Sequence, residues 1–481
     1  MIKSPSKAAA AVVVSLLLAL PAAAQQKAGA AGKALIQQMV AMKGQGAPAI
    51  KAYKEALSNG DAQVRRAAIQ LLVKEAGKPA IPDLKTMLAD SDEWVVIAAG
   101  IGLLDLGEHP MPEIQQALKH DHMDVRMELA EHIGEFDHTA YLTHVGSMIS
   151  DPEPKVRLAS VRAMQAISSK DSLQPLMAAT ADAERGVATL AIQALESLGD
   201  PRALQRLTRM ANTEDLALKR AVAHAVVVLG GASSHAELTT KLLADEDVGV
   251  RRSILNGMRE QPDEAALSIL SGRLDKLPTT GDRHAAVLVY KATESENSHG
   301  PLVKLIADPE ARVRSSAVLA AGQKNVDALM DAVVTRVEDK EAQVRSSVAY
   351  ALGHEGREAS VPHLTKLSKD PSGDVRASAV QSAATVGTEG ALKIVLAALG
   401  DSESYVAIQA VRSLGKFEQE AALEKLRELA KHSDLQVRLS AISGLGMRKD
   451  KGSVPMLKEL AKEPVEVVRR AARSALDQIG E

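Results

Sequence analysis

The fold is decided by a stretch that recurs along the chain and reads DPSGDVRASAVQSAA in the copy at residues 370–384. Asp370 and Pro371 at its start are typical of a turn. Val375 and Arg376 follow, and small residues come three, four and seven positions after the valine. That spacing places them on one face of a helix, where small side chains let a neighbouring helix approach closely. The stretch therefore predicts a turn followed by a tightly packed helix.

The position of Val375, called the framing position below, has counterparts along the whole chain. Thirteen successive intervals of 30 to 32 residues separate fourteen framing residues, which are Val64, Val95, Val125, Val156, Val187, Leu218, Val250, Asp282, Val313, Val344, Val375, Val406, Val437 and Val468. A shorter apolar segment precedes each of them, as Val361, Leu364 and Leu367 precede Val375. Each unit thus reads as two helices, and stacked pairs share one core. We predict an all-α solenoid of about 14 helix pairs over residues 48–479, with a period of about 31 residues.

Glycines follow many of the second helices and predict where those helices end. They are Gly107, Gly199, Gly353, Gly387, Gly415 and Gly446. One repeat is irregular, because Asp282 stands in the framing position and follows two successive intervals of 32 residues. We expect a bend or hinge near residues 260–300.

The first 24 residues have the pattern of a cleavable signal peptide. Lys3 and Lys7 precede an uncharged apolar run over residues 8–20, and small residues at 22–24 suit cleavage before Gln25. Residues 25–47 read as a linker or lead-in. The chain has no cysteine, which suits an oxidising compartment. We therefore expect an exported protein, periplasmic or extracellular, without a transmembrane span once the signal is removed.

Composition excludes several functions. The 58 basic and 61 acidic residues among 481 give a net charge of −3, and aromatic residues make up 2% of the chain. A nucleic-acid partner is not expected from such a balance. Without cysteine there is no thiolate metal site and no thiol nucleophile. We expect no cofactor and no catalytic residue.

The recurring pattern D-x-x-x-x-V-R-x-x-A-x-x-A-L-G resembles HEAT repeats, specifically the short type named after phycobilisome lyase subunits. The resemblance covers nearly the whole chain after residue 48. It implies that the Val-Arg helices line the concave face and that each turn aspartate pairs with an arginine of a neighbouring repeat. The arginines of this structural ladder would be Arg65, Arg126, Arg157, Arg251, Arg283, Arg314, Arg345, Arg376, Arg438 and Arg469. Val96, Ala188, Lys219 and Ala407 would interrupt it.

If positions three, four, seven and eight after the framing residue form the core, positions two and six face outward. These positions vary among the repeats, as expected of a surface that packing does not constrain. Ile97, Ile101, Met127 and Leu158 predict an apolar patch, and Arg220, Arg252, Asn256 and Arg259 a more basic middle. We expect a protein or peptide to bind along this concave face, at Arg66, Gln70, Ile97, Ile101, Met127, Glu131, Leu158, Arg162, Arg220, Arg252, Asn256, Tyr350 and Arg412.

An enzyme or metal protein is the first alternative. Six of the 13 histidines fall within 36 residues, namely His109, His120, His122, His132, His138 and His144. Their spacing matches no strong metal motif. Deoxyhypusine hydroxylase carries a di-iron site on HEAT-type repeats, held by His-Glu pairs at the start of the Val-Arg helix. The one such dipeptide here, His354-Glu355, follows Gly353, so that ligand set is absent. Resemblance to the lyases rests on repeat type alone.

These observations favour a non-catalytic protein-binding scaffold or adaptor outside the cytoplasm. A self-associating structural spacer, which binds only through its ends, is the second alternative.

Overall fold

The computed structural model describes residues 29–107, 109 and 111–481, so the predicted signal peptide lies outside the described residues. Within them the chain forms 29 α-helices and nine short 3₁₀-helices and contains no strand. It divides into two compact units, residues up to Leu229 (unit 1) and Gly230–Glu481 (unit 2). None of the described helices is both long enough and apolar enough to cross a bilayer. The fold is an all-α solenoid.

Unit 1 contains twelve whole helices and most of α14. Its α-helices are α2 (Ala30–Ala41), α3 (Ala47–Ala56), α4 (Ala62–Ala76), α5 (Ile81–Met87), α6 (Glu93–Leu106), α7 (Pro112–Ala117), α8 (Met123–Glu135), α9 (Leu142–Ser147), α10 (Pro154–Ile167), α11 (Leu173–Ala179), α12 (Arg185–Leu198), α13 (Leu204–Met210) and α14 (Leu216–Ser234). The 3₁₀-helices are η1 (Lys78–Ala80), η2 (Thr139–Tyr141), η3 (Met148–Ser150), η4 (Lys170–Ser172) and η5 (Pro201–Ala203). Helix α2 lies within the lead-in expected over residues 25–47.

Unit 2 continues the same alternation. Its α-helices are α15 (Ala236–Leu243), α16 (Val248–Glu260), α17 (Glu264–Arg273), α18 (Thr280–Lys291), α19 (His299–Ile306), α20 (Ala311–Lys324), α21 (Asp327–Val334), α22 (Ala342–Glu355), α23 (Val361–Leu367), α24 (Gly373–Val386), α25 (Glu389–Ala398), α26 (Ser404–Leu414), α27 (Glu420–Leu429), α28 (Leu435–Met447), α29 (Val454–Leu460) and α30 (Glu466–Ile479). The 3₁₀-helices are η6 (Leu274–Lys276), η7 (Glu296–Ser298), η8 (Glu358–Ser360) and η9 (Lys451–Ser453).

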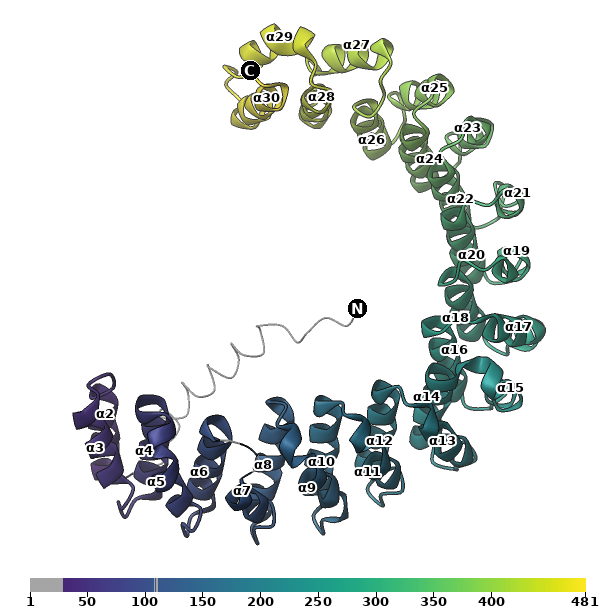
Figure 1. Ribbon diagram of the computed structural model, residues 1–481. Helices are drawn as coiled ribbons and strands as arrows, with labels where there is room; N and C mark the ends of the chain where they lie inside the picture. The colour runs from purple at the N-terminus through teal and green to yellow at the C-terminus, as the bar shows by residue number, and fades with distance from the viewer. Residues whose placement is uncertain (1–28, 108, 110) are drawn as a thin grey trace. The chain divides into compact units, whose positions relative to one another are not determined.

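The helices of each unit form two rows (Figure 1). All fourteen framing residues lie on even-numbered helices from α4 to α30, here called the even row, and the odd row carries the shorter helices. Eleven framing valines and Asp282 are almost completely buried, while Leu218 and Val437 are half-buried. The repeat pattern of the sequence therefore predicted the core of the fold correctly.

Small residues set the distance between neighbouring even helices. A Cβ atom added at Gly134 in α8 would lie 2.4 Å from Cα of Ala163 in α10, and one at Gly322 in α20 would lie 2.7 Å from Cα of Ala351. Distances this short exclude any side chain unless the two helices move apart. The glycines therefore fix a close backbone approach inside the array.

Two of the predicted helix ends are wrong for the same reason. Gly353 lies inside α22, where an added Cβ would meet Cα of Ser382 at 2.7 Å, and Gly446 lies inside α28 against Ala475. Gly199 and Gly387 do end their helices with a left-handed backbone, at φ 68° and 72°. A glycine near the end of a repeat thus serves either as a cap or as a contact point.

The turn aspartates bind backbone amides at the start of the even helices. Oδ1 of Asp370 accepts from the amide of Ser372 at 2.9 Å, and Oδ1 of Asp401 accepts from that of Glu403 at 2.9 Å. Such bonds satisfy amides that have no partner within the helix. The turn sequence therefore positions each even helix.

Two sites depart from the regular repeat. Gly231 interrupts α14 with φ 65° and ψ 160°, next to the boundary between the units. In unit 2, Asp282 forms a capping box with Thr279 at the start of α18, where other repeats have a valine. The second departure lies within residues 260–300, and the bend or hinge expected there stays a prediction.

Candidate protein-binding surface

Residues at positions two and six of the even helices range from fully exposed to buried. Arg162, Arg220, Arg252, Asn256, Tyr350 and Arg412 are exposed, and Arg66, Ile101, Met127, Glu131 and Leu158 are half-buried. Gln70 and Ile97 are 8% and 5% exposed, so the expectation of an open surface is wrong for these two. The spacing of positions alone could not show their burial.

Both residues lie in a cavity of about 230 Å³ between three even helices of unit 1. It is lined by Arg66, Ile69, Gln70, Val73 and Lys74 of α4, by Trp94, Ile97, Ala98, Ile101, Gly102 and Asp105 of α6, and by Glu128 of α8. The α4 and α6 residues recur at helical spacing, so each helix contributes one face. The walls are chiefly apolar, and a few polar groups converge on them, as in small ligand sites.

Helix α6 creates this cavity because it has no charged residue between Glu93 and Asp105. Its apolar side chains surround the helix, and several of them line the cavity. Trp94, at the rim of the cavity, is 37% exposed and is the one tryptophan of the chain. The sequence predicted an apolar patch here but not the cavity or the roles of Trp94 and Glu128.

Charged groups flank the cavity and are partly desolvated. The guanidinium carbon of Arg66 lies 5.6 Å from the centre of the Trp94 ring, and burial lowers the pKa of Arg66. Burial also raises the pKa of Glu128, and the nearby carboxylates of Glu131 and Asp124 raise it further. Oε1 of Gln70 is buried and accepts no hydrogen bond within the described part of the chain. The cavity therefore contains polar groups that its own walls leave incompletely satisfied.

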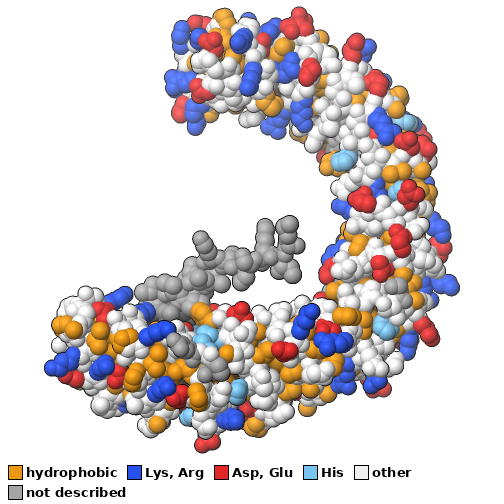
Figure 2. All heavy atoms as spheres, viewed as in Figure 1, with side chains coloured by type: hydrophobic (Ala, Val, Ile, Leu, Met, Phe, Trp, Pro, Cys, Tyr) orange, Lys and Arg blue, Asp and Glu red, His pale blue; other side chains and the backbone are white. Residues whose placement is uncertain are grey.

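The rest of the exposed surface has mixed character. Figure 2 shows acidic and basic side chains interspersed over each unit on the face in view, without a block of one sign. Arg252, Asn256 and Arg259 are exposed on α16 of unit 2, and Tyr350 of α22 is 51% exposed. Single exposed side chains of this kind are normal on a protein surface and do not by themselves define a site.

The structure brings three of the six clustered histidines together. The ring of His138 lies 4.6 Å from that of His109 and 6.0 Å from that of His132, measured between ring centres. His120 and His122 lie in the turn before α8, and His144 lies in α9. The cluster expected from the sequence is therefore split between three places.

Hydrogen bonds already occupy two of the three neighbouring histidines. His109 bonds the hydroxyl of Tyr141 through Nδ1 at 2.9 Å and the carbonyl oxygen of Leu104 through Nε2 at 2.9 Å, and His132 bonds Asp105 at 2.9 Å. The carbonyl requires a proton on Nε2 of His109, so Nδ1 accepts from Tyr141 in the neutral ring. Burial and these two rings lower the pKa of His138 to about 4. The hydrogen bonds of His109 and His132 favour structural roles for these rings over a metal centre.

The arginines expected to form the ladder follow one geometry in most repeats. Both terminal oxygens of an aspartate accept from one arginine, at 2.6 to 3.2 Å, in the pairs Arg65–Asp90, Arg126–Asp151, Arg157–Asp182, Arg283–Asp308, Arg314–Asp339, Arg345–Asp370 and Arg376–Asp401. Each aspartate belongs to the turn of the next repeat. Bidentate geometry makes these stronger than ordinary surface pairs.

Three arginines of the ladder have other partners. Arg251 reaches Asp282 at 2.9 Å, Arg438 lies 3.5 Å from Glu463, and Arg469 donates to the carbonyl oxygen of Glu463 at 2.8 Å. The turn of the Asp282 repeat has Leu277 where eight other turns have aspartate. Asp282 therefore supplies to Arg251 the carboxylate that this turn lacks.

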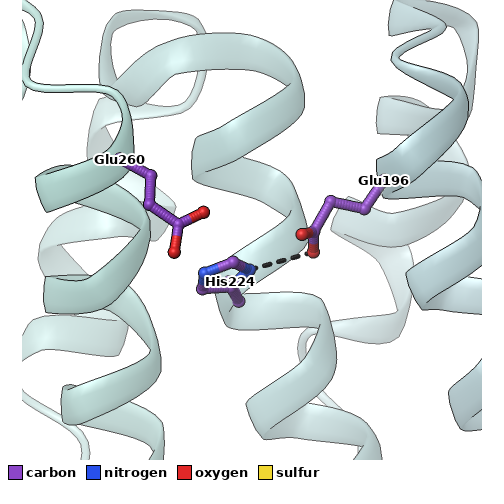
Figure 3. Close-up of side chains that lie close together, drawn as sticks. All are labelled: Glu196, His224 and Glu260. Atoms are coloured by element: carbon purple, nitrogen blue, oxygen red, sulfur yellow. Dashed lines mark hydrogen bonds and ion pairs between the residues drawn. The ribbon is translucent and has the colours of Figure 1, made fainter. Parts of the chain in front are cut away.

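Where the ladder is interrupted, unit 1 contains pairs that the sequence did not reveal. Arg185 donates to Asp215 at 2.7 Å, and His224 bonds Glu196 at 2.9 Å through Nδ1, as Figure 3 shows. These residues do not recur at a fixed offset from the framing position, so no sequence pattern pointed to them.

An all-α array of stacked helix pairs, held by small residues and a ladder of turn ion pairs, defines an α-solenoid repeat protein. The family profile described as HEAT repeats matches residues 110–196, 142–227, 301–385 and 392–477. Together these matches cover more than half of the 481 residues, and the chain belongs to the HEAT repeat family. No curated protein matches the chain in sequence.

Solved structures of a karyopherin have the same fold. Kap121p aligns with a TM-score of 0.58 and 13% identity over 99% of this chain and 57% of its own. Kap121p bound to the SUMO protease Ulp1p aligns with a TM-score of 0.59 and 13% identity, over the same shares of the two chains, and Kap121p bound to Nup53p with a TM-score of 0.57 and 13% identity. At this identity the likeness concerns the fold. The chain spans a little over half the length of these structures.

Proposed function

We propose that the chain is a non-catalytic scaffold that binds a polypeptide on the outward face of its even helices. The observation that carries this proposal is the cavity between α4, α6 and α8, which the repeats leave unfilled on that face. Exposed residues at positions two and six continue the same row of helices in both units. Structures of Kap121p bound to Ulp1p and to Nup53p support a protein ligand by analogy of fold.

The same proposal includes the subtype of the repeats and the export of the chain. The 31-residue period and the paired turn aspartates support the short repeat type named after phycobilisome lyase subunits. The Lys-rich start, the apolar run and the small residues before Gln25 support export to the periplasm or the cell exterior. Sequencing the N-terminus of the chain recovered from cells tests export, because a mature chain should begin at Gln25. A chain that retains Met1 in the cytoplasm would refute it.

Position-specific crosslinking in cells tests the binding face. A photoreactive residue replaces Arg162 of α10 or Arg252 of α16, both exposed on the even row, and in a matched control it replaces Gln174, exposed on α11 of the odd row. We expect the two even-row positions to capture one recurrent protein that the Gln174 position does not. Equal capture from all three positions would contradict the proposal, and capture of the chain itself alone would favour the self-associating spacer.

A further inference from the structure

The α4–α6–α8 cavity contains three polar side chains whose bonding is incomplete. Gln70 is more than nine-tenths buried, and its Oε1 atom has no donor among the described residues. Arg66 is half-buried and stacks over Trp94, and Glu128 is half-buried on the opposite helix. Within the described part of the chain, neither of these two charged side chains forms a hydrogen bond or an ion pair.

Such groups are costly unless a partner satisfies them. A buried acceptor without a donor and partly desolvated charges each oppose folding. Lys74 and Asp105 also line the cavity, but both have partners of their own, and Asp105 is bonded to His132 at 2.9 Å. The cavity lining thus includes a buried acceptor amide and a cation on α4 and an anion on α8, and the two charges attract each other without forming an ion pair.

The apolar part of the cavity limits what can enter. A volume of about 230 Å³ exceeds that of an engineered cavity of about 150 Å³ that admits benzene. Ile97, Ile101 and the ring of Trp94 line it, so it suits one aromatic or leucine-sized side chain. Binding surfaces commonly concentrate their affinity in such a single buried anchor.

We infer that this cavity is a recognition pocket for a peptide segment with one large apolar anchor residue flanked by an acidic and a basic residue. The anchor fills the space over Ile97 and Ile101, and a backbone N–H of the peptide donates to Oε1 of Gln70. The acidic residue pairs with Arg66 and the basic residue with Glu128. This inference rests on the proposed function and names the partner chemistry of one of its sites.

Charge complementarity favours a peptide with one acidic and one basic residue over other occupants. A doubly acidic segment places one carboxylate beside Glu128, and a doubly basic segment places one cation beside Arg66. Like charges at such partly desolvated positions oppose binding. A purely apolar ligand leaves Arg66, Glu128 and Gln70 unsatisfied.

Trp94 makes the test direct, because it is the one tryptophan in the chain and lies at the rim of the pocket. The purified chain is titrated with pools of capped seven-residue peptides that lack tryptophan, and Trp94 emission is recorded. The central residue is Leu, Phe or Ala. Its neighbours are one Asp and one Lys in either order, two Asp, two Lys or two Ser.

We expect a saturable change of emission with the Leu and Phe pools that carry one Asp and one Lys. Half-saturation should require at least about tenfold more of the Ala-centred pool, because the anchor supplies most of the affinity. Arg66→Gln should abolish the preference for Asp, and Glu128→Gln the preference for Lys. Arg209→Gln, exposed on α13 in the odd row of unit 1, is the matched control and should change neither preference.

Several results would overturn the inference. One is the absence of a saturable change with every pool, and another is equal binding of the Ala-centred pool. Equal saturation by free leucine would identify a small-molecule site instead of a peptide site. If even-row crosslinking still captures one protein while the pools fail, the pocket assignment is wrong and the scaffold function stands. If both fail, both are wrong.

Discussion

Replacing Asp282 by valine should destabilise unit 2, although it restores the residue type that other repeats have at this position. Asp282 is fully buried and accepts from Nε of Arg251 at 2.9 Å and from the hydroxyl of Thr279 at 2.8 Å. Its removal leaves the guanidinium of Arg251, itself 4% exposed, without its carboxylate. Valine satisfies neither donor.

The size of the effect follows from two opposing terms. Breaking a buried ion pair by removing one partner costs about 3 to 5 kcal/mol, and loss of the cap adds to it. Burial of the valine side chain stabilises the folded state by about 1.5 kcal/mol. The carbonyl oxygens of Asp245 and Glu246 also still accept hydrogen bonds from Arg251, at 2.7 and 2.9 Å. We therefore expect Asp282→Val to lower the free energy of unfolding of unit 2 by about 3 kcal/mol. The double variant Arg251→Met/Asp282→Val should recover most of that loss, because no buried charge remains.

Urea unfolding followed by far-ultraviolet circular dichroism measures the effect. Trp94 emission reports unit 1 and should keep its transition in both variants, which controls for a general loss of structure. Asp275→Ala is the matched control, since Asp275 forms an exposed pair with Lys304 at 3.2 Å and its loss should cost less than about 1 kcal/mol. A wild-type transition for Asp282→Val, or a double variant no more stable than the single one, would refute the reasoning.

Three further predictions concern helix approach and titration. Gly134→Ala should destabilise unit 1 by about 1 to 3 kcal/mol in urea unfolding, because the new Cβ meets the backbone of α10. The control Gly272→Ala, whose new Cβ has no atom within 4 Å, should be neutral or slightly stabilising. The pKa of His138, about 4, lies below its ordinary value of 6.5, so the unfolded chain binds more protons between these values. The stability of unit 1 should therefore fall by about 1 to 2 kcal/mol as the pH drops from 6.5 to 4, a range that allows for the partial exposure of His138. In urea titrations at several pH values, His138→Gln should flatten this dependence, whereas the exposed control His354→Gln should not. Hydrogen bonds from Arg376 hold the pKa of Asp401 below its ordinary 3.8, so Asp401→Asn should lower the free energy of unfolding by about 2 kcal/mol at neutral pH. The difference in unfolding free energy between variant and wild type should shrink below pH 3.8, and a constant difference there would contradict the assignment.

The repeat and its core could be predicted because they depend on local periodicity. The framing valine and the small residues after it recur at fixed spacing, and burial follows from that spacing alone. The pairing of Arg65 with Asp90 could be expected from the family resemblance, since both residues occupy fixed repeat positions. Helix α2 lacks a framing valine and was therefore not distinguished from a linker.

Features that depend on distances between helices could not be predicted. Gly353 looks like a helix cap in the sequence, but its role is set by Ser382 in another helix. Asp282 looks like a defect in the framing pattern. Its role becomes clear only from its hydrogen bond with Arg251, because Asp282 replaces the turn aspartate that is absent at Leu277. In each case the decisive neighbour lies about 30 residues away in the sequence.

The recognition pocket arises from the same rule that holds the array together. Small residues bring even helices close together and leave little room on their outward face, so a cavity needs a helix whose large apolar side chains extend beyond the shared core. Helix α6 meets this condition, with Trp94, Ile97 and Ile101 on one face. A repeat array that evolves a binding site can therefore change one helix and keep the packing of all the others, because stability depends on contacts between neighbouring repeats. On this reasoning, specificity for a partner resides in the few repeats that depart from the common pattern.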